Sequence, residues 1–178
     1  MTLAAARMGR LLTDLLDVAQ IDAGRFPLEK RRHDARALLS EVRRAYRPLF
    51  AGRGVSLVID APEELVLASF DYDRVEQLLS NLLGNAMKFT PAGGRVALHV
   101  ERSGQQLVFV VRDDGIGIDP DTLPKIFERF WRYDTDSRPG LGLGLYICRT
   151  IAVAHGGDIT VQSELGGGTT FRVSLPVS

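Results

Sequence analysis

Two asparagines and a lysine stand in one short stretch, NLLGNAMKFT, which covers residues 81–90. Asn81 and Asn85 are four residues apart and so share one face of a helix, with Lys88 on an adjacent face. The amide oxygen of Asn85 suits Mg²⁺, a hard cation that prefers oxygen ligands, and Lys88 suits a phosphate as a point charge. A capping or surface pair of asparagines is the ordinary alternative. Taken alone, the stretch leaves both interpretations open.

A second candidate is the glycine cluster RDDGIGI, which follows the apolar stretch LVFVV. A carboxylate at a strand end, here Asp113, can accept a hydrogen bond from an exocyclic amine while the backbone turns away. Gly115 and Gly117 would supply that turn. Ordinary Asp-Gly turns that close strands have the same pattern, and the cluster by itself favours this second interpretation.

Glycines and leucines alternate in a third stretch, GLGLGL, directly before an apolar helical pattern. Gly140, Gly142 and Gly144 would let backbone N–H groups approach a ligand, and the start of the helix adds a partial positive charge that attracts phosphate. A flexible linker is the alternative. Linkers are polar, however, whereas Leu141 and Leu143 are apolar and indicate anchored positions.

Helices and strands must hold these stretches together. Apolar spacing predicts four helices. The first ends near Gly24, and the other three cover about residues 35–50, 72–90 and 141–155. Short or alternating apolar runs predict strands within residues 55–60, 64–70, 95–113, 158–163 and 169–176. This order predicts a two-layer α/β sandwich, one mixed and mostly antiparallel sheet with helices on one face. The first helix has its own apolar stripe, and we expect it to belong to a separate bundle.

Composition limits the classes of function. The 178 residues carry 22 Lys and Arg against 22 Asp and Glu, and this zero net charge argues against a nucleic-acid binder. The only cysteine, Cys148, excludes an internal disulfide and is expected in the core. No apolar run approaches the roughly 20 residues that span a bilayer. We therefore expect a soluble, cytoplasmic chain, whose parent protein could still be attached to a membrane.

Five stretches resemble, in this order, the N, G1, F, G2 and G3 boxes of sensor histidine kinases: NLLGNAMKFT, DDGIGI, IFERFWR, GLGLGL and GGGTTF. The resemblance covers about residues 55–176. It implies the Bergerat ATP-binding fold, which these kinases share with type II topoisomerases, the MutL repair proteins and the heat-shock chaperone ATPases. It also implies ATP and Mg²⁺ as ligands.

The resemblance assigns roles residue by residue. Asp113 matches the aspartate that binds the adenine amine, Asn85 matches the Mg²⁺ ligand, Lys88 lies near the phosphates, and Arg132 matches a lid arginine that reaches the γ-phosphate. Asp114 departs from the asparagine usual in the family, a change that we expect to matter little. The other nucleotide-binding positions lie in the glycine turns and the turn that closes the pocket: Gly115, Gly117, Gly140, Leu141, Gly142, Leu143, Gly144, Thr169 and Thr170.

One position separates phosphotransfer from hydrolysis. Relatives that hydrolyse ATP carry a glutamate one helical turn before the metal asparagine, and this chain has Asn81 there. An amide cannot act as a general base near neutral pH. We therefore expect a kinase in which Asn81, Lys88 and Arg132 serve transfer of a phosphoryl group to another acceptor.

The N-terminal stretch LLTDLLDVAQIDAG resembles the second helix of the family's dimerisation and phosphoacceptor hairpin. We assign residues 1–26 to that helix, 27–33 to a linker and 34–178 to the catalytic ATP-binding domain. The acceptor histidine belongs on the first hairpin helix, which is not found here, so autophosphorylation in cis is not expected. His33 is expected in an exposed linker, and His155 at a helix end, where the helix dipole explains it.

The resemblance also implies partners: ATP, the hairpin that carries the histidine, and a response regulator that receives the phosphate. Self-association through the apolar stripe of the first helix would give a homodimer. Two alternatives stay open, a serine kinase of the anti-sigma-factor type and a nucleotide-binding or docking module without activity. The hairpin-like helix argues against the first, and Asp113, Asn85 and the glycine boxes argue against the second.

Overall fold

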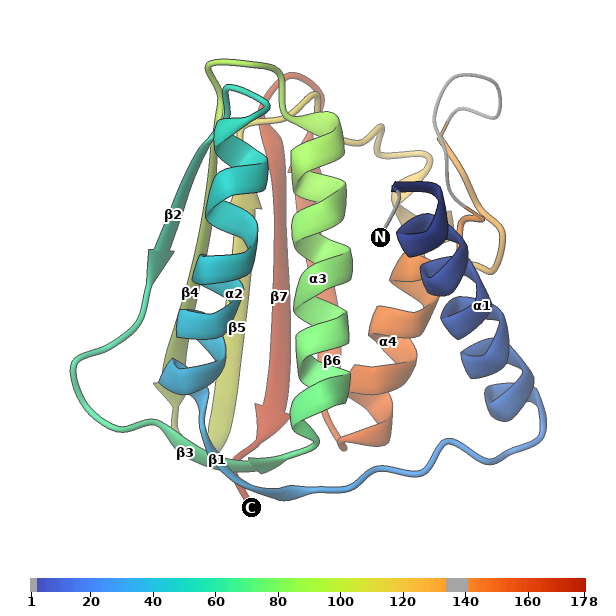
Figure 1. Cartoon of the computed structure of the whole chain (residues 1–178), viewed down its shortest axis with the longest axis vertical. Coiled ribbons are helices and arrows are strands. Elements are labelled where there is room, and N and C mark those ends of the chain that lie inside the picture. Colours follow the sequence, from blue (N-terminus) through green and yellow to red (C-terminus); the bar gives the residue numbers. More distant parts are fainter. Residues whose placement is uncertain (1–2, 134–140) are drawn as a thin grey trace.

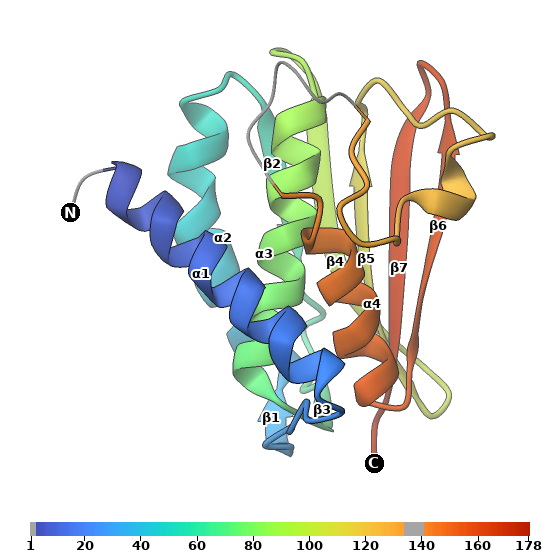
Figure 2. The same cartoon turned by 90° about the vertical axis from the view of Figure 1, so that its right-hand side faces the viewer.

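The computed structural model describes residues 3–133 and 141–178. Its strands are β1 (Arg31–Asp34), β2 (Ser56–Asp60), β3 (Leu67–Phe70), β4 (Arg95–Ser103), β5 (Gln106–Asp113), β6 (Asp158–Glu164) and β7 (Gly168–Pro176). Its helices are α1 (Leu3–Asp22), α2 (Ala35–Ala51), α3 (Tyr72–Phe89) and α4 (Gly144–Ala154), with a short 3-10 turn η1 (Leu123–Lys125). Helices α2, α3 and α4 cover one face of the main sheet (Figure 1). Helix α1 lies beside α4 at one side of this helical layer (Figure 2).

The main sheet has the strand order β2-β4-β5-β7-β6. All neighbouring pairs are antiparallel except β2 and β4, which are parallel. The chain from β2 to β4 passes through α3, and a crossover of that kind joins parallel strands. The predicted two-layer α/β sandwich with a mixed, mostly antiparallel sheet is therefore confirmed.

The prediction of a single sheet is wrong, because β1 and β3 form a separate antiparallel pair. His33 lies in β1, and its ring centre is 5.3 Å from that of Phe70 and 5.2 Å from that of Tyr72. These aromatic contacts leave His33 half-buried. The expectation that it lies in an exposed linker is therefore also wrong.

Two aspartates start the helices that follow this small sheet. The Asp34 carboxylate accepts a hydrogen bond from the backbone N–H of Arg36, and the Asp71 carboxylate accepts one from Arg74, each at 3.1 Å. Such N-caps satisfy donors that the first helical turn leaves without partners. The predicted starts of α2 after Asp34 and of α3 after Asp71 are thus confirmed, and Cys148 is buried in the core as expected.

Helix α1 has two different sides. Val18 and Asp17 are buried against the rest of the chain. One side of α1 therefore packs on the domain core, which the sequence did not lead us to expect. The opposite side is exposed and carries large apolar residues: Met8, Leu12, Leu15 and Leu16. This apolar side has the character of a surface that packs against further helices. No helix in residues 3–133 and 141–178 is long and apolar enough to cross a bilayer.

Asp17 and Asp22 of α1 make polar contacts with the domain. The buried Asp17 carboxylate accepts hydrogen bonds from Arg74 Nη1 at 2.7 Å and from Gln77 Nε2 at 2.6 Å. At the end of α1, Asp22 Oδ1 lies 2.5 Å from Arg129 Nη2. The first contact is shielded from water and the second is exposed, so loss of one partner is expected to cost more at Asp17 than at Asp22.

We predict that Arg74→Met releases α1 from the domain. The substitution leaves the Asp17 carboxylate without its cationic partner in a buried place, which costs about 3 kcal/mol or more if α1 stays docked. Hydrogen exchange should show α1 amides opening at least a hundredfold more often, while α3 and the sheet stay protected. Arg172→Met, which breaks the exposed pair with Glu101, is the control and should leave α1 unchanged. Unaltered α1 protection in Arg74→Met would contradict the prediction.

His155 follows α4 and is buried. Its Nε2 accepts the backbone N–H of Asp71 at 3.0 Å, and its Nδ1 donates to the carbonyl of Ile151 at 2.7 Å. Both contacts require the neutral ring with its proton on Nδ1. Burial lowers the pKa of His155, an effect that the nearby Lys30 ammonium increases. The attraction between a charged ring and the helix dipole, which we inferred from the sequence, is therefore not what holds His155.

We predict that the free energy of unfolding falls as the pH drops below about 6.5, the usual histidine pKa. Because the folded state lowers the pKa of His155, the unfolded chain takes up the proton first, and stability is lost from that pH down through the folded-state pKa. One proton contributes at most about 1.4 kcal/mol per pH unit. Urea unfolding from about pH 7.5 to 5.5 should therefore show a steeper loss in the unchanged chain than in His155→Gln. Equal slopes would count against this role of His155.

Candidate functional site

The helix-facing side of the sheet is apolar along most of its length and becomes polar at one end. Strand register places one apolar row across β5, β7 and β6: Val111, Phe171 and Val161. The next row on the same face, two residues further along each strand, consists of three polar side chains: Asp113, Thr169 and Ser163. A ligand at this end of the sheet would therefore meet hydrogen-bonding groups.

Asp113 is buried, with 6% of its surface exposed. Its Oδ1 accepts the backbone N–H of Gly115 at 2.9 Å. Burial raises the pKa of the Asp113 carboxyl, the N–H groups of Gly115 and Thr169 act in the opposite direction, and the charge of Asp114 adds to the rise. A buried carboxylate whose charged form is penalised by its surroundings is typical of functional sites.

The turn after Asp113 is pressed between α3 and β6. A Cβ atom at Gly115 would lie 2.5 Å from Asp113 Oδ1 and 2.9 Å from the carbonyl oxygen of Phe89. Gly117 has φ +72°, and a Cβ there would lie 1.9 Å from the carbonyl oxygen of Glu164. Only glycine fits these two positions, so the surface next to the Asp113 side chain consists of backbone atoms.

The predicted polar face of α3 lies beside this turn. Leu82 and Leu83 are buried, whereas Asn81, Asn85 and Lys88 are half-buried. The carbonyl of Phe89, directly after Lys88, accepts the N–H of Ile116 at 3.3 Å. This contact ties the end of α3 to the glycine turn after Asp113.

Asn81 also contacts the start of α4. Its Nδ2 lies 3.4 Å from the carbonyl oxygen of Gly144, and a Cβ at Gly144 would lie 3.5 Å from the Asn81 side chain. Gly142 has φ +73°, and its missing Cβ would lie 2.5 Å from the carbonyl oxygen of Trp131. Gly142 therefore permits a close approach of the backbone to Trp131, whereas a Cβ at Gly144 would make an ordinary contact with Asn81.

Of the two leucines that the sequence indicated as buried anchors, only Leu143 is buried. Leu143 is 1% exposed, whereas Leu141 is 36% exposed. Gly140 lies outside the described residues.

Two aromatic side chains of the IFERFWR stretch pack on their own domain. The Phe127 ring meets the ring of Phe171 edge-on, with centres 6.4 Å apart, and Trp131 is partly buried against the core. Phe130 is 59% exposed and has φ +62°, an uncommon conformation for a side chain of this size. Arg132 follows and is half-buried.

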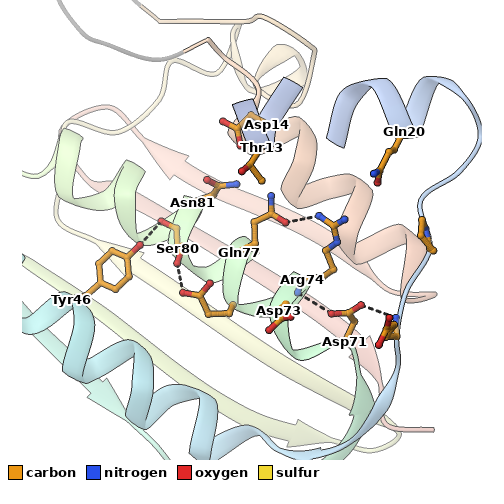
Figure 3. Close-up of a pocket in the computed structure, with 13 residues that line it drawn as sticks. Thr13, Asp14, Gln20, Tyr46, Asp71, Asp73, Arg74, Gln77, Ser80 and Asn81 are labelled. Carbon is orange, nitrogen blue, oxygen red and sulfur yellow. Dashed lines mark hydrogen bonds between the residues drawn. The ribbon is translucent and has the colours of Figure 1, made fainter. Parts of the chain in front are cut away.

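A cavity of about 740 Å³ lies elsewhere, between α1 and α3 (Figure 3). Of the residues selected from the sequence, only Asn81 lines it. Its one cationic side chain, Arg74, is paired with Asp17. Five carboxylates also line it: Asp14, Glu29, Asp71, Asp73 and Glu76. Such a lining repels phosphate, so this cavity is not suited to a nucleotide.

Sequence reasoning missed Ser163. Its Oγ accepts the N–H of Ile118 at 2.8 Å and lies 2.9 Å from Thr169 Oγ1. The signal was the alternation in β6, because Ile159 and Val161 face the helices and Ser163 is the next residue on that face. A polar residue that continues the apolar face of a strand at the strand's end is a candidate for a ligand-binding site, and Ser163 meets this criterion.

Comparisons with known proteins now bear on this arrangement. The sequence pattern of the histidine kinase-, DNA gyrase B- and HSP90-like ATPase family matches residues 70–178, more than half of the chain. The chain belongs to this family. Its ATPase-like domain therefore includes α3, α4, the strands β4 to β7 and the polar row at their end.

Several relatives in this ATPase-like family are sensor kinases. Sensor protein SrrB of Staphylococcus aureus is 37% identical over 173 residues, which are 96% of this chain and 30% of SrrB. Full-length ShkA, crystallised in complex with AMPPNP, has 33% identity and a TM-score of 0.86 over 95% of this chain and 35% of ShkA. The nucleotide-free catalytic domain of histidine kinase ThkA has 26% identity and a TM-score of 0.75 over 84% of this chain and 96% of that domain.

These likenesses confirm the predicted family and its Bergerat-type fold. The chain spans 30% of the length of SrrB, so the activity of a whole sensor kinase is a separate question. The roles of individual residues stay predictions.

Proposed function

We propose that this chain binds ATP and transfers its γ-phosphoryl group to a histidine on a separate hairpin helix, as the catalytic part of a sensor histidine kinase. The observation that carries the proposal is the buried Asp113 carboxylate beside the tight turn at Gly115 and Gly117, whose backbone packs against Phe89 and Glu164. Such a carboxylate can accept a hydrogen bond from the exocyclic amine of adenine. Because ATP is the substrate, we also place the chain in the cytoplasm.

The remaining sequence-selected residues would hold the phosphates and close the site. Lys88 and Arg132 would supply positive charge to the phosphates, and Thr169 would close the pocket at β7. Thr170 was also selected from the sequence, but it pairs with Arg112 and lies on the opposite face of the sheet. The backbone of Leu141, Gly142, Leu143 and Gly144, which leads into α4, would approach the phosphates. Catalysis then rests on positioning and electrostatics.

Asn85 is the residue that would hold Mg²⁺. Its amide oxygen is a hard donor of the type that Mg²⁺ prefers. Within residues 3–133 and 141–178, no group of three or more His, Cys, Asp or Glu side chains could hold a metal ion. Mg²⁺ usually keeps several waters and binds through one or two protein ligands together with substrate phosphates, so Asn85 would share the cation with phosphate oxygens and water. When bound, Mg²⁺ would neutralise phosphate charge.

Transfer is favoured over hydrolysis because Asn81 carries an amide where a general base would be needed. Its Nδ2 faces the carbonyl of Gly144, which is a positioning contact and not a proton-accepting one. His155 is also unsuited as an acceptor, because it is buried and both of its ring nitrogens are hydrogen-bonded. We therefore assign the acceptor to another helix, with a response regulator receiving the phosphate afterwards.

The exposed apolar side of α1 supports this assignment. Met8, Leu12, Leu15 and Leu16 would pack against the first helix of the hairpin, or against a second copy in a homodimer. This chain would thus supply ATP chemistry, and its partner helix would supply the histidine.

The test has two steps. The intact chain is first titrated calorimetrically with ADP and Mg²⁺, and binding is expected. It is then incubated with γ-labelled ATP, with and without a helical hairpin that carries the acceptor histidine. Acid-labile label on the hairpin, with none on the chain, is the expected result. Acid-stable label would indicate a serine acceptor, stable label on the chain itself would contradict the role in trans, and no ADP binding would favour a docking module.

A further inference from the structure

Ser163 makes three hydrogen bonds at the polar end of the sheet. Its hydroxyl lies 2.8 Å from the carbonyl oxygen of Gly168, 2.8 Å from the backbone nitrogen of Ile118 and 2.9 Å from Thr169 Oγ1. It therefore joins the glycine turn after β5 to the start of β7.

The proton count at Ser163 fixes the direction of each bond. A hydroxyl has one proton to donate and two lone pairs that accept. The Gly168 carbonyl can only accept, so it takes the Ser163 proton, and the N–H of Ile118 can only donate. The third bond must then run from Thr169 Oγ1–H to Ser163 Oγ. Thr169 consequently presents only lone pairs to any other group.

Thr169 and Asp113 are directly paired across β7 and β5. Side chains in such a pair lie on the same face of the sheet with Cβ atoms about 5 Å apart. Both are buried, at 7% and 6% exposure. With Thr169 held as an acceptor, two neighbouring oxygen acceptors lie on the same face of the sheet, where one ligand edge would meet both. An amine satisfies them, whereas a carbonyl in its place leaves acceptors facing an acceptor.

We propose that Ser163 is a positioning residue that fixes the Thr169 hydroxyl as an acceptor and so helps the site to prefer adenine over a ring with a carbonyl at the same place. This inference rests on the proposed function and adds to it the residue that sets part of the base preference. In Ser163→Ala, the Thr169 hydroxyl is free to rotate and donate to such a carbonyl.

The experiment compares the dissociation constants of ADP and of inosine diphosphate, whose ring carries a carbonyl in place of the amine. In Ser163→Ala, we expect the preference for ADP to fall about fivefold, the factor that one neutral hydrogen bond is worth. Ser163→Thr keeps the hydroxyl and should keep the preference. Damage to the fold alone would weaken the binding of both nucleotides equally and leave the ratio of their dissociation constants unchanged.

A second pair of variants tests the route through Thr169. Thr169→Val removes the hydroxyl that Ser163 orients, so adding Ser163→Ala in that background should not change the ratio further. Ser174→Ala, which alters a different hydroxyl of β7 that contacts Asp158, is the matched control.

The outcomes separate this inference from the proposed function. If the unchanged chain binds ADP but Ser163→Ala keeps the full preference, the inference is overturned alone. A further drop on adding Ser163→Ala to Thr169→Val overturns it as well. If the unchanged chain binds neither nucleotide, the proposed function fails and the inference fails with it.

Discussion

Asp113→Asn is expected to weaken ADP binding at least a hundredfold while the fold stays intact. The backbone N–H of Gly115 holds one oxygen of this side chain at 2.9 Å, so an amide would keep its oxygen there and turn its NH₂ group towards the ligand. A donor would then face the adenine amine, and a charge-assisted hydrogen bond would be lost. Calorimetric titration with ADP and Mg²⁺ measures the loss.

The same substitution should leave thermal stability unchanged or raise it. Burial raises the pKa of Asp113 in the folded state, so this group stabilises the fold when protonated and loses that contribution as the pH rises through its folded-state pKa. At neutral pH the uncharged amide avoids the cost of burying a charge. Loss of binding together with an unchanged or higher melting temperature would identify a residue kept for ligand recognition.

Asp114→Asn is the matched control. Asp114 is the next residue along the chain, carries the same side chain and is exposed. Its substitution also introduces the asparagine usual in the family. We expect ADP affinity within about twofold of the unchanged chain, since an exposed charge contributes little. Equal effects of the two substitutions, or full affinity in Asp113→Asn, would show that the adenine contact lies elsewhere.

Gly117→Ala is expected to lower the free energy of unfolding strongly. The added methyl group would lie 1.9 Å from the carbonyl oxygen of Glu164, and the residue has φ +72°. Left-handed backbone costs alanine about 1–2 kcal/mol, and relief of the overlap requires the turn to move away from β6. We expect a total loss of about 3 kcal/mol or more, because both terms act together. Urea unfolding measures it.

Gly166→Ala separates the two terms. Gly166 has φ +76°, close to that of Gly117, but no atom lies within 4 Å of the position its Cβ would take. Only the backbone term applies there, so the expected loss is about 1–2 kcal/mol. Equal losses in the two variants would mean that the overlap with the Glu164 carbonyl adds nothing to the loss of stability in Gly117→Ala.

The local features of this fold were readable from the sequence. The starts of α2 and α3 follow from Asp34 and Asp71, because an N-cap needs only its own side chain and the next few N–H groups. The buried and exposed faces of α3 follow from the spacing of its leucines and asparagines. Gly117 and Gly142 were selected as turn positions, and both have left-handed φ values.

Other features required the tertiary structure, because they depend on residues far apart in the chain. The neutral state of His155 results from the backbone N–H of Asp71, 84 residues earlier. The attachment of α1 results from Arg74, 57 residues after Asp17. Neither contact leaves a periodic signal in the sequence, so the helix-dipole explanation of His155 was wrong and the docking of one side of α1 on the domain was not anticipated.

The candidate site combines both kinds of information. The sequence by itself determined the boxes, the family and the residue types that suit a nucleotide, since glycine turns and a strand-end carboxylate are local patterns. Only the tertiary structure decided the register that lines up Asp113, Thr169 and Ser163. Strand register is set by packing across the whole sheet, and that packing places a serine from β6 in contact with the threonine paired to Asp113.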